Sequence, residues 1–74
     1  MKRQPLESSI IRSVGYDKGS RTLEIEFMGG EVYQYHQVPE DIYERLMKAS
    51  SHGKYFLEEI RGMYPYKKVG ETTT

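Results

Sequence analysis

The sequence predicts an α+β domain in which a three-stranded antiparallel β-sheet is followed by two α-helices packed on one face. Two observations carry this prediction. Apolar and polar residues alternate over residues 22–28, which is typical of a strand with one buried face. Pro39, Glu40 and Asp41 form a helix start, because proline suits the first helical position and acids complement the helix N-terminus.

Length and composition set outer limits. The chain has 74 residues, which allows one small core, and no cysteine, which excludes disulfides, thiolate zinc sites and cysteine nucleophiles. The first residues contain no apolar block of the signal-peptide kind, and no run approaches the roughly 20 apolar residues of a membrane span. We therefore expect a cytoplasmic protein without membrane contact, with one domain over 8–69 and flexible tails at 1–7 and 70–74.

Charge is balanced in sum but divided along the chain. There are 11 acids and 11 bases, so the net charge gives no general attraction to nucleic acid or membrane. Six acids and no base occupy residues 22–44, whereas six bases and two acids occupy residues 45–68. The division has two interpretations: ordinary surface charge arranged along helix dipoles, or a functional basic face in the C-terminal half.

The first strand is predicted over residues 9–17, followed by a turn at 17–20. Its inward face is left open by the pattern. Ile10, Val14 and Tyr16 share one parity and Ile11 has the other, which is compatible with a bulge or a twist.

The second strand, residues 22–28, directs Leu23, Ile25 and Phe27 to one face and Thr22, Glu24 and Glu26 to the other. The register of the third strand depends on the turn. A two-residue loop at Gly29 and Gly30 places Tyr33 and Tyr35 beside the glutamates.

A three-residue loop over 28–30, with Gly30 left-handed, instead pairs Phe27 with Glu31 and places Tyr33 and Tyr35 on the side of Ile25 and Leu23. We favour this second register because it puts the tyrosine rings over the core. It leaves Val32, Gln34 and His36 outside with the acids.

The first helix is predicted from Pro39 to about Ala49. Its buried stripe contains Ile42, Leu46 and Ala49, with Tyr43 and Met47 beside it. Ser50 or Ser51 then caps a second helix over residues 54–62, in which Phe56, Ile60 and Met63 share a face next to Leu57. Pro65 ends this helix, and residues 64–69 leave as an extended segment.

With these elements in place, the chain resembles the KTSC domain family, a module found at the C-terminus of some lysyl-tRNA synthetases and as stand-alone bacterial proteins. The resemblance covers nearly the whole expected domain. It rests on Val14-Gly15-Tyr16-Asp17, Leu23-Glu24-Ile25-Glu26-Phe27, Tyr33-Gln34-Tyr35, Val38-Pro39, Ala49-Ser50-Ser51-His52-Gly53-Lys54-Tyr55-Phe56, Ile60-Arg61 and Tyr64-Pro65-Tyr66. The resemblance implies this fold, and the synthetase context suggests RNA as a partner.

The candidate nucleic-acid-binding residues combine cations for phosphates with aromatic rings that can stack on unpaired bases. They are Lys54, Tyr55, Arg61, Tyr64, Tyr66, Lys67 and Lys68. The alternative is structural: Tyr64 and Tyr66 hold the C-terminal segment on the fold while the lysines stay in solvent. Tyr33 and Tyr35 can likewise stack on bases, but the favoured register makes them structural core residues.

Other chemistry has little support in the sequence. His36 and His52 match no metal-ligand spacing, even with Glu58 or Glu59, so we expect no metal and no cofactor. No nucleophile elbow surrounds Ser50 or Ser51, and we expect no catalytic residues.

The sequence therefore predicts a small non-enzymatic binding module. Its expected partner is RNA, such as tRNA, bound through the basic, tyrosine-containing C-terminal half. The alternative is a protein-protein interaction or homo-oligomerisation module that pairs through a sheet edge or a tyrosine-rich surface with another protein or a second copy.

Overall fold

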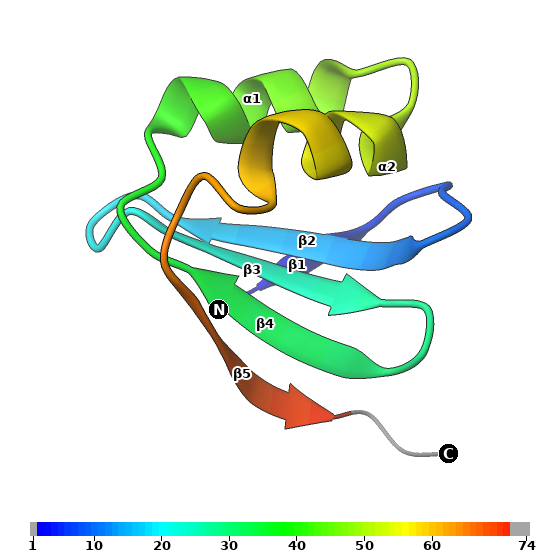
Figure 1. The fold of residues 1–74 in the computed structure, drawn as a ribbon, viewed down its shortest axis with the longest axis horizontal. Coiled ribbons are helices and arrows are strands. Elements are labelled where there is room, and N and C mark those ends of the chain that lie inside the picture. The colour runs from blue at the N-terminus through cyan, green and yellow to red at the C-terminus, as the bar shows by residue number, and fades with distance from the viewer. Residues whose placement is uncertain (1, 72–74) are drawn as a thin grey trace.

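A computed structural model describes residues 2–71. In chain order its elements are β1 (Arg3–Pro5), β2 (Ile11–Asp17), β3 (Thr22–Phe27), β4 (Glu31–Tyr35), α1 (Glu40–Lys48), α2 (His52–Tyr55), the π-helix η1 (Phe56–Ile60) and β5 (Tyr66–Glu71). The strands form one antiparallel sheet in the order β1-β2-β3-β4-β5. The helices lie together over one face of this sheet, and β5 lies at the edge remote from β1 (Figure 1). Within the described residues, no helix is long and apolar enough to cross a membrane.

The α+β class and the helical layer on one face are confirmed, but the expected number of three strands is wrong. Arg3–Pro5 pairs with β2, and Tyr66–Glu71 pairs with β4. Both additional strands contain few apolar residues, lack clean alternation and lie at the two edges of the sheet, so a hydrophobic pattern does not mark them. Parts of both segments expected as tails therefore belong to the sheet; residues 1 and 72–74 lie outside the described part of the chain.

A bulge settles the inward face of β2. The register against β3 shifts between Ile11 and Ser13, so Ile11 faces Phe27 while Val14 faces Ile25. The additional residue brings Ile11 and Val14 to the same face despite their opposite parity, and both are fully buried.

The turn between β3 and β4 has the predicted geometry. Gly30 has a φ of +99°, and its N–H donates to the carbonyl of Phe27 at 2.9 Å. The resulting register places Tyr35 opposite Leu23 and Tyr33 opposite Ile25. The prediction that both tyrosines face the core side of the sheet is thereby confirmed.

The outer sheet face differs from the expected solvent-exposed acidic surface. Glu24 and Glu26 are 9% and 7% exposed, and Val32 is also buried. Glu24 accepts hydrogen bonds from Arg3 at 2.8 Å and from Gln34 at 2.9 Å. The Ser13 hydroxyl donates to Glu26 at 2.8 Å. Arg3 on β1 supplies a cation for Glu24, and both carboxylates accept hydrogen bonds, which offsets the cost of burying them.

The helical layer follows the prediction through α1 and departs from it afterwards. Leu46 is fully buried in α1. Ser51 caps α2 by accepting the Lys54 N–H at 3.3 Å. The predicted helix over 54–62 is wrong at both ends, because the helix begins at His52 and ends in a π-turn at Ile60. Met63 therefore lies beyond the helix and is 68% exposed.

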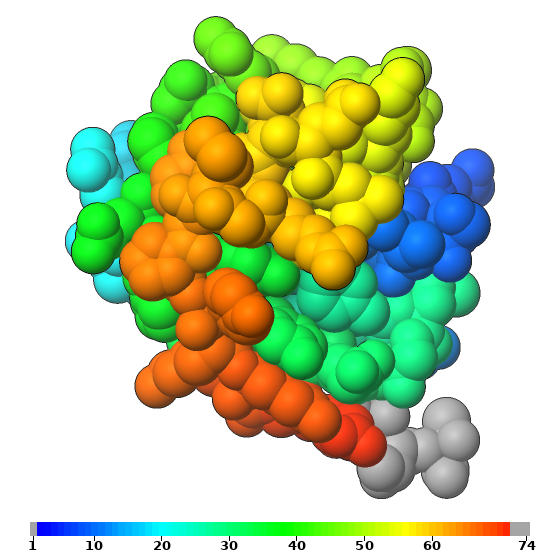
Figure 2. All heavy atoms as spheres, viewed as in Figure 1, coloured from blue at the N-terminus to red at the C-terminus, as the bar shows by residue number. Residues whose placement is uncertain are grey.

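The core lies between the sheet and the helices. Its largest fully buried side chains are Ile11, Leu23, Ile25, Leu46, Ile60, Val14 and Val38. The helices cover β2 and β3 more completely than they cover β4 and β5, so one part of the helix-facing sheet surface remains accessible (Figures 1 and 2).

Candidate functional site

An open groove of about 640 Å³ lies between the sheet and the segment that follows α2. Phe27, Tyr33 and Tyr35 line it from the sheet, Phe56 and Leu57 from η1, and Tyr66 from β5. Figure 2 shows this hollow where atoms of β3 and β4 reach the surface between the yellow-orange helical segment and β5. Its aromatic lining identifies it as a ligand-binding candidate.

Five aromatic rings in the groove contact one another. Phe56 meets Phe27 and Tyr35 edge to face, with centroid distances of 5.3 and 5.5 Å. Tyr66 lies beside both Tyr33 and Tyr35, at 5.8 and 5.5 Å. Because Tyr66 is 58% exposed, much of its ring is available to a ligand, whereas Tyr35 is only 5% exposed and supports it from below.

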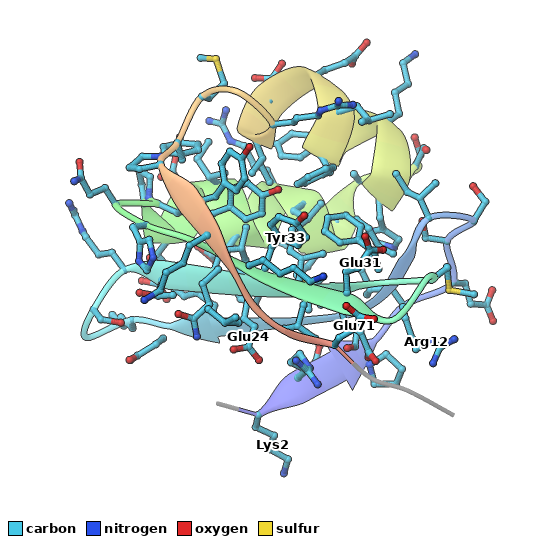
Figure 3. All side chains as sticks on the ribbon, turned by 60° about the horizontal axis from the view of Figure 1, so that its bottom comes forward. Lys2, Arg12, Glu24, Glu31, Tyr33 and Glu71 are labelled. Atoms are coloured by element: carbon cyan, nitrogen blue, oxygen red, sulfur yellow. The ribbon has the colours of Figure 1, made fainter. Side chains whose placement is uncertain are left out.

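Strand alternation and register assemble the ring cluster. Tyr33 and Tyr35 are two residues apart on β4 and therefore share a face, and Tyr66 lies directly opposite Tyr35 across the β4–β5 pair. Figure 3 shows Tyr33 on the helix side of the sheet and Glu24 on the other side. The groove therefore occupies the face opposite the buried glutamates.

The π-helix brings Arg61 to the rim of the groove. The Arg61 N–H donates to the Phe56 carbonyl at 2.9 Å, which closes the wide turn. Gly62 follows with a φ of +81°, a conformation that glycine adopts without strain, and turns the chain toward β5. The Arg61 guanidinium makes no ion pair or side-chain hydrogen bond within residues 2–71 and remains available to an anion.

Tyr35 has the most perturbed phenol of the groove. Burial, reinforced by the neighbouring Tyr66 and Tyr33 hydroxyls and opposed by Arg61, raises the pKa of Tyr35 to about 12. The Tyr35 hydroxyl is protonated at neutral pH and can donate a hydrogen bond to a ligand.

The structure disperses the residues proposed from sequence as a nucleic-acid surface. That set comprised Lys54, Tyr55, Arg61, Tyr64, Tyr66, Lys67 and Lys68, of which only Arg61 and Tyr66 line the groove. Tyr55 and Tyr64 pack against the core cluster, and Lys54 is exposed on α2.

The two β5 lysines face opposite sides of the sheet. Lys68 lies opposite Tyr33 on the groove side, and Lys67 lies opposite Gln34 on the outer side. The Lys68 ammonium donates to Glu71 at 2.6 Å, and this hydrogen bond raises the pKa of Lys68 and lowers that of Glu71. A continuous basic surface across both lysines is therefore not formed by this strand.

Sequence reasoning missed the contribution of Phe27, Phe56 and Leu57 to the groove. The first two were assigned to the core, where they do pack, but one side of their cluster remains open. Leu57 was placed beside the core and is 47% exposed. Leu57 indicates a binding groove only when the structure of η1 is known, because the π-turn determines on which side of the helix this leucine is exposed.

The remaining polar candidates have structural partners. Ser51 accepts the capping hydrogen bond from Lys54, and His52 Nδ1 donates to the Leu46 carbonyl at 2.7 Å. Ser51 thus caps α2, and His52 ties α2 to the end of α1. In residues 2–71, no group of three or more histidine, aspartate or glutamate side chains is placed to hold a metal ion.

The fold and groove define a small α+β domain whose sheet is covered by helices on one face and retains an open aromatic groove there. The chain belongs to the KTSC domain family, which matches residues 7–66.

Relatives of known sequence and structure support this assignment. The chain is 45% identical over 70 residues to an uncharacterized protein of Stutzerimonas stutzeri, covering 93% of this chain and 99% of that protein. It is 43% identical to a crystallographically solved KTSC domain protein of Yersinia pestis, with a TM-score of 0.91 and coverage of 93% and 97% of the two chains.

The family also occurs within a larger protein. The chain is 36% identical over 63 residues to a lysine–tRNA ligase of Nostoc punctiforme, covering 85% of this chain but only 11% of the ligase. This relative therefore shares a domain with the chain, while most of the ligase lies outside the similarity.

Proposed function

We propose that this domain is a non-enzymatic RNA-binding module that holds an unpaired stretch of RNA in the aromatic groove. The observation that carries the proposal is the exposed ring of Tyr66, which contacts Tyr33 and the buried Tyr35 and lines the same groove as the unpaired Arg61. An unpaired base stacks on such a ring, and the nearby guanidinium meets a phosphate or extends the stack.

The charge arrangement favours a short contact with RNA. Within residues 2–71 Arg61 has no ion-pair partner, whereas Lys68 forms an ion pair with Glu71. Lys67 projects from the other face of the sheet. Few phosphates are then neutralised in the groove. Each neutralised phosphate of a single strand contributes about −0.7 to the slope of log affinity against log salt, so we expect a shallow salt dependence.

The lysine–tRNA ligase relative supports RNA as the ligand class. In that protein a region similar to this domain accompanies an enzyme whose name specifies a tRNA substrate. A module with an aromatic groove is suited to an unpaired loop or end, because bases there are free to stack on a protein ring. For this chain the extension remains part of the proposal.

The test is fluorescence anisotropy with a labelled mixed-sequence single-stranded RNA and with tRNA at two salt concentrations. Tyr66→Ala removes the stacking ring, and we expect at least about a fivefold loss of affinity. Lys54→Ala is the control, since Lys54 belongs to the set proposed from sequence, is exposed on α2 and does not line the groove. Equal losses in both variants, or no binding at low salt, would contradict the groove as the RNA site.

A second candidate function is docking of a protein segment, or of a second copy, along β5. This strand is an edge of the sheet, and edge strands accept an additional strand through their unpaired backbone groups. Lys67 and Lys68 disfavour such pairing, as lysines on edge strands generally do, and this weighs toward RNA. Concentration-dependent sedimentation, with no response to RNA, would favour the second candidate.

A further inference from the structure

Three phenol hydroxyls project from the same side of the sheet at one end of the groove. Tyr33, Tyr35 and Tyr66 share this face, and the Tyr66 ring contacts the other two. Cross-strand neighbours stand roughly perpendicular to the sheet, so their hydroxyl ends rise together. The effect of Tyr66 and Tyr33 on the pKa of Tyr35 is consistent with this convergence.

These hydroxyls are free to bind a ligand. Within residues 2–71 none of the three makes a hydrogen bond to another protein group, whereas the Tyr16 hydroxyl donates to the Val38 carbonyl at 2.5 Å. A hydroxyl that lines a groove without a protein partner turns to water or to a ligand. The groove thus offers three O–H donors on neighbouring strands.

Arg61 adds a positive charge to the same donor set. Its guanidinium lines the groove and interacts electrostatically with Tyr35, and it has no carboxylate partner within the described residues. Among the described residues of the groove lining the carboxylate belongs to Glu31, which is two residues from Tyr33 and four from Tyr35 along β4, or about 7 and 13 Å at 3.3 Å per residue. The end of the groove at Tyr35 and Tyr66 is therefore the end better suited to an anion.

We infer that Tyr33, Tyr35, Tyr66 and Arg61 form a phosphate-binding site. A phosphate carries several strong acceptor oxygens, which match three hydroxyl donors and a guanidinium better than a two-oxygen carboxylate does. One part of the inference rests on the proposed function, namely that the bound phosphate belongs to the RNA nucleotide whose base stacks on Tyr66. The domain then recognises a nucleotide as a unit of base and phosphate.

The experiment compares four ribonucleoside 5′-monophosphates with their nucleosides, followed by NMR on the labelled protein at constant ionic strength. We expect at least one monophosphate to bind at least about fivefold more tightly than its nucleoside, because charge-assisted hydrogen bonds are stronger than neutral ones. Inorganic phosphate is titrated separately, and its shifts at the tyrosine end of the groove distinguish a site for free phosphate from one that requires the attached nucleoside.

Single-atom variants separate hydroxyl donation from ring stacking. Tyr66→Phe and Tyr35→Phe keep the rings, so we expect them to lower monophosphate affinity by about threefold or more and to leave nucleoside affinity unchanged. Tyr55→Phe is the control outside the groove. Arg61→Gln should remove the preference for the monophosphate, whereas Arg12→Gln, at another exposed arginine, should preserve it.

The outcomes separate this inference from the RNA proposal. Equal binding of nucleosides and monophosphates, or full monophosphate affinity in both phenylalanine variants, would overturn the phosphate site even where RNA still binds. Binding of monophosphates or inorganic phosphate at the tyrosines, with no binding of RNA, would support the site and overturn the RNA proposal. Absence of binding by all the phosphate probes would overturn the inference.

Discussion

Tyr66 on β5 lies directly opposite Tyr35 on β4, with ring centroids 5.5 Å apart and an interplanar angle of 31°. One ring is 58% exposed and the other 5% exposed. The pair therefore joins the core to the groove: the buried ring fixes the position of the ring that a ligand meets. Rigid support of this kind reduces the ordering cost of binding.

The buried phenol of Tyr35 predicts a loss of stability at high pH. Its folded-state pKa of about 12 lies above the ordinary value of 10.0, mainly because of burial. The unfolded chain then loses this proton at a lower pH than the folded chain. The stabilisation is complete below pH 10 and is lost as pH rises through about 12.

Denaturant unfolding between neutral pH and pH 12 measures this effect, and tyrosinate absorbance reports the ionisation itself. Tyr35→Phe should reduce the fall in stability across this pH range relative to the parent chain. An unchanged fall in that variant would assign the alkaline transition to other groups.

We predict that replacing Gly53 of α2 by alanine lowers the stability of the domain, although this substitution usually stabilises a helix. Alanine normally stabilises a helix by about 1 kcal/mol relative to glycine. At this position an added Cβ would lie 2.8 Å from Ile10 Cγ1 and 3.0 Å from Cδ1. We expect Gly53→Ala to lower the free energy of unfolding by about 1–2 kcal/mol, as overpacking does.

The Ile10→Ala background isolates the cause. With the isoleucine removed, Gly53→Ala should cost little or become stabilising in urea unfolding. The same loss in both backgrounds would show that contact with Ile10 is not the origin.

We predict that the N-cap hydrogen bond of Ser51 stabilises α2 and that the adjacent Ser50 makes no such contribution. Its side chain accepts the Lys54 N–H, so Ser51→Ala should cost about 1 kcal/mol of stability. Ser50→Ala is the adjacent control and should change stability by less than about 0.5 kcal/mol. Thermal unfolding of both variants checks the assignment, and equal effects would argue against a specific cap at Ser51.

We predict that β1 contributes to the stability of the domain through the ion pair of Arg3 with Glu24. It donates to the largely buried Glu24 at 2.8 Å, and Arg3→Ala would remove this charged partner. We expect a loss of about 1–3 kcal/mol in denaturant unfolding. Arg12→Ala is the control, since Arg12 is exposed and, within residues 2–71, its side chain has a single hydrogen bond, to the Met28 carbonyl at 3.3 Å. Equal stability of the two variants would mean that β1 is only loosely held.

The sequence predicted the central part of the fold because local and tertiary preferences agree there. Alternation in residues 22–28 and the glycine turn placed Tyr33 and Tyr35 on the correct face. The edge strands Arg3–Pro5 and Tyr66–Glu71 were not predicted, because both are largely polar. They are strands because they pair with β2 and β4. Their backbone hydrogen bonds have no signature in a hydrophobic pattern.

The candidate site was predicted only in part. Tyr66 and Arg61 were selected for aromatic and basic character, and both line the groove. The separation of Lys67 from Lys68 depends on strand alternation in β5, and the position of Arg61 depends on the π-turn at Phe56–Ile60. Neither feature follows from composition, because the extended segment was not expected to pair and the helix was expected to continue to Gly62.

The most direct test of the central claim is an amide-shift titration of the isotope-labelled protein with a mixed-sequence single-stranded RNA, at low and near-physiological salt. The account predicts localised shifts around Tyr33, Tyr35, Arg61 and Tyr66, which weaken modestly as salt rises. Unchanged spectra in both salts, or shifts confined to the outer sheet face around Glu24, would contradict RNA binding in the groove.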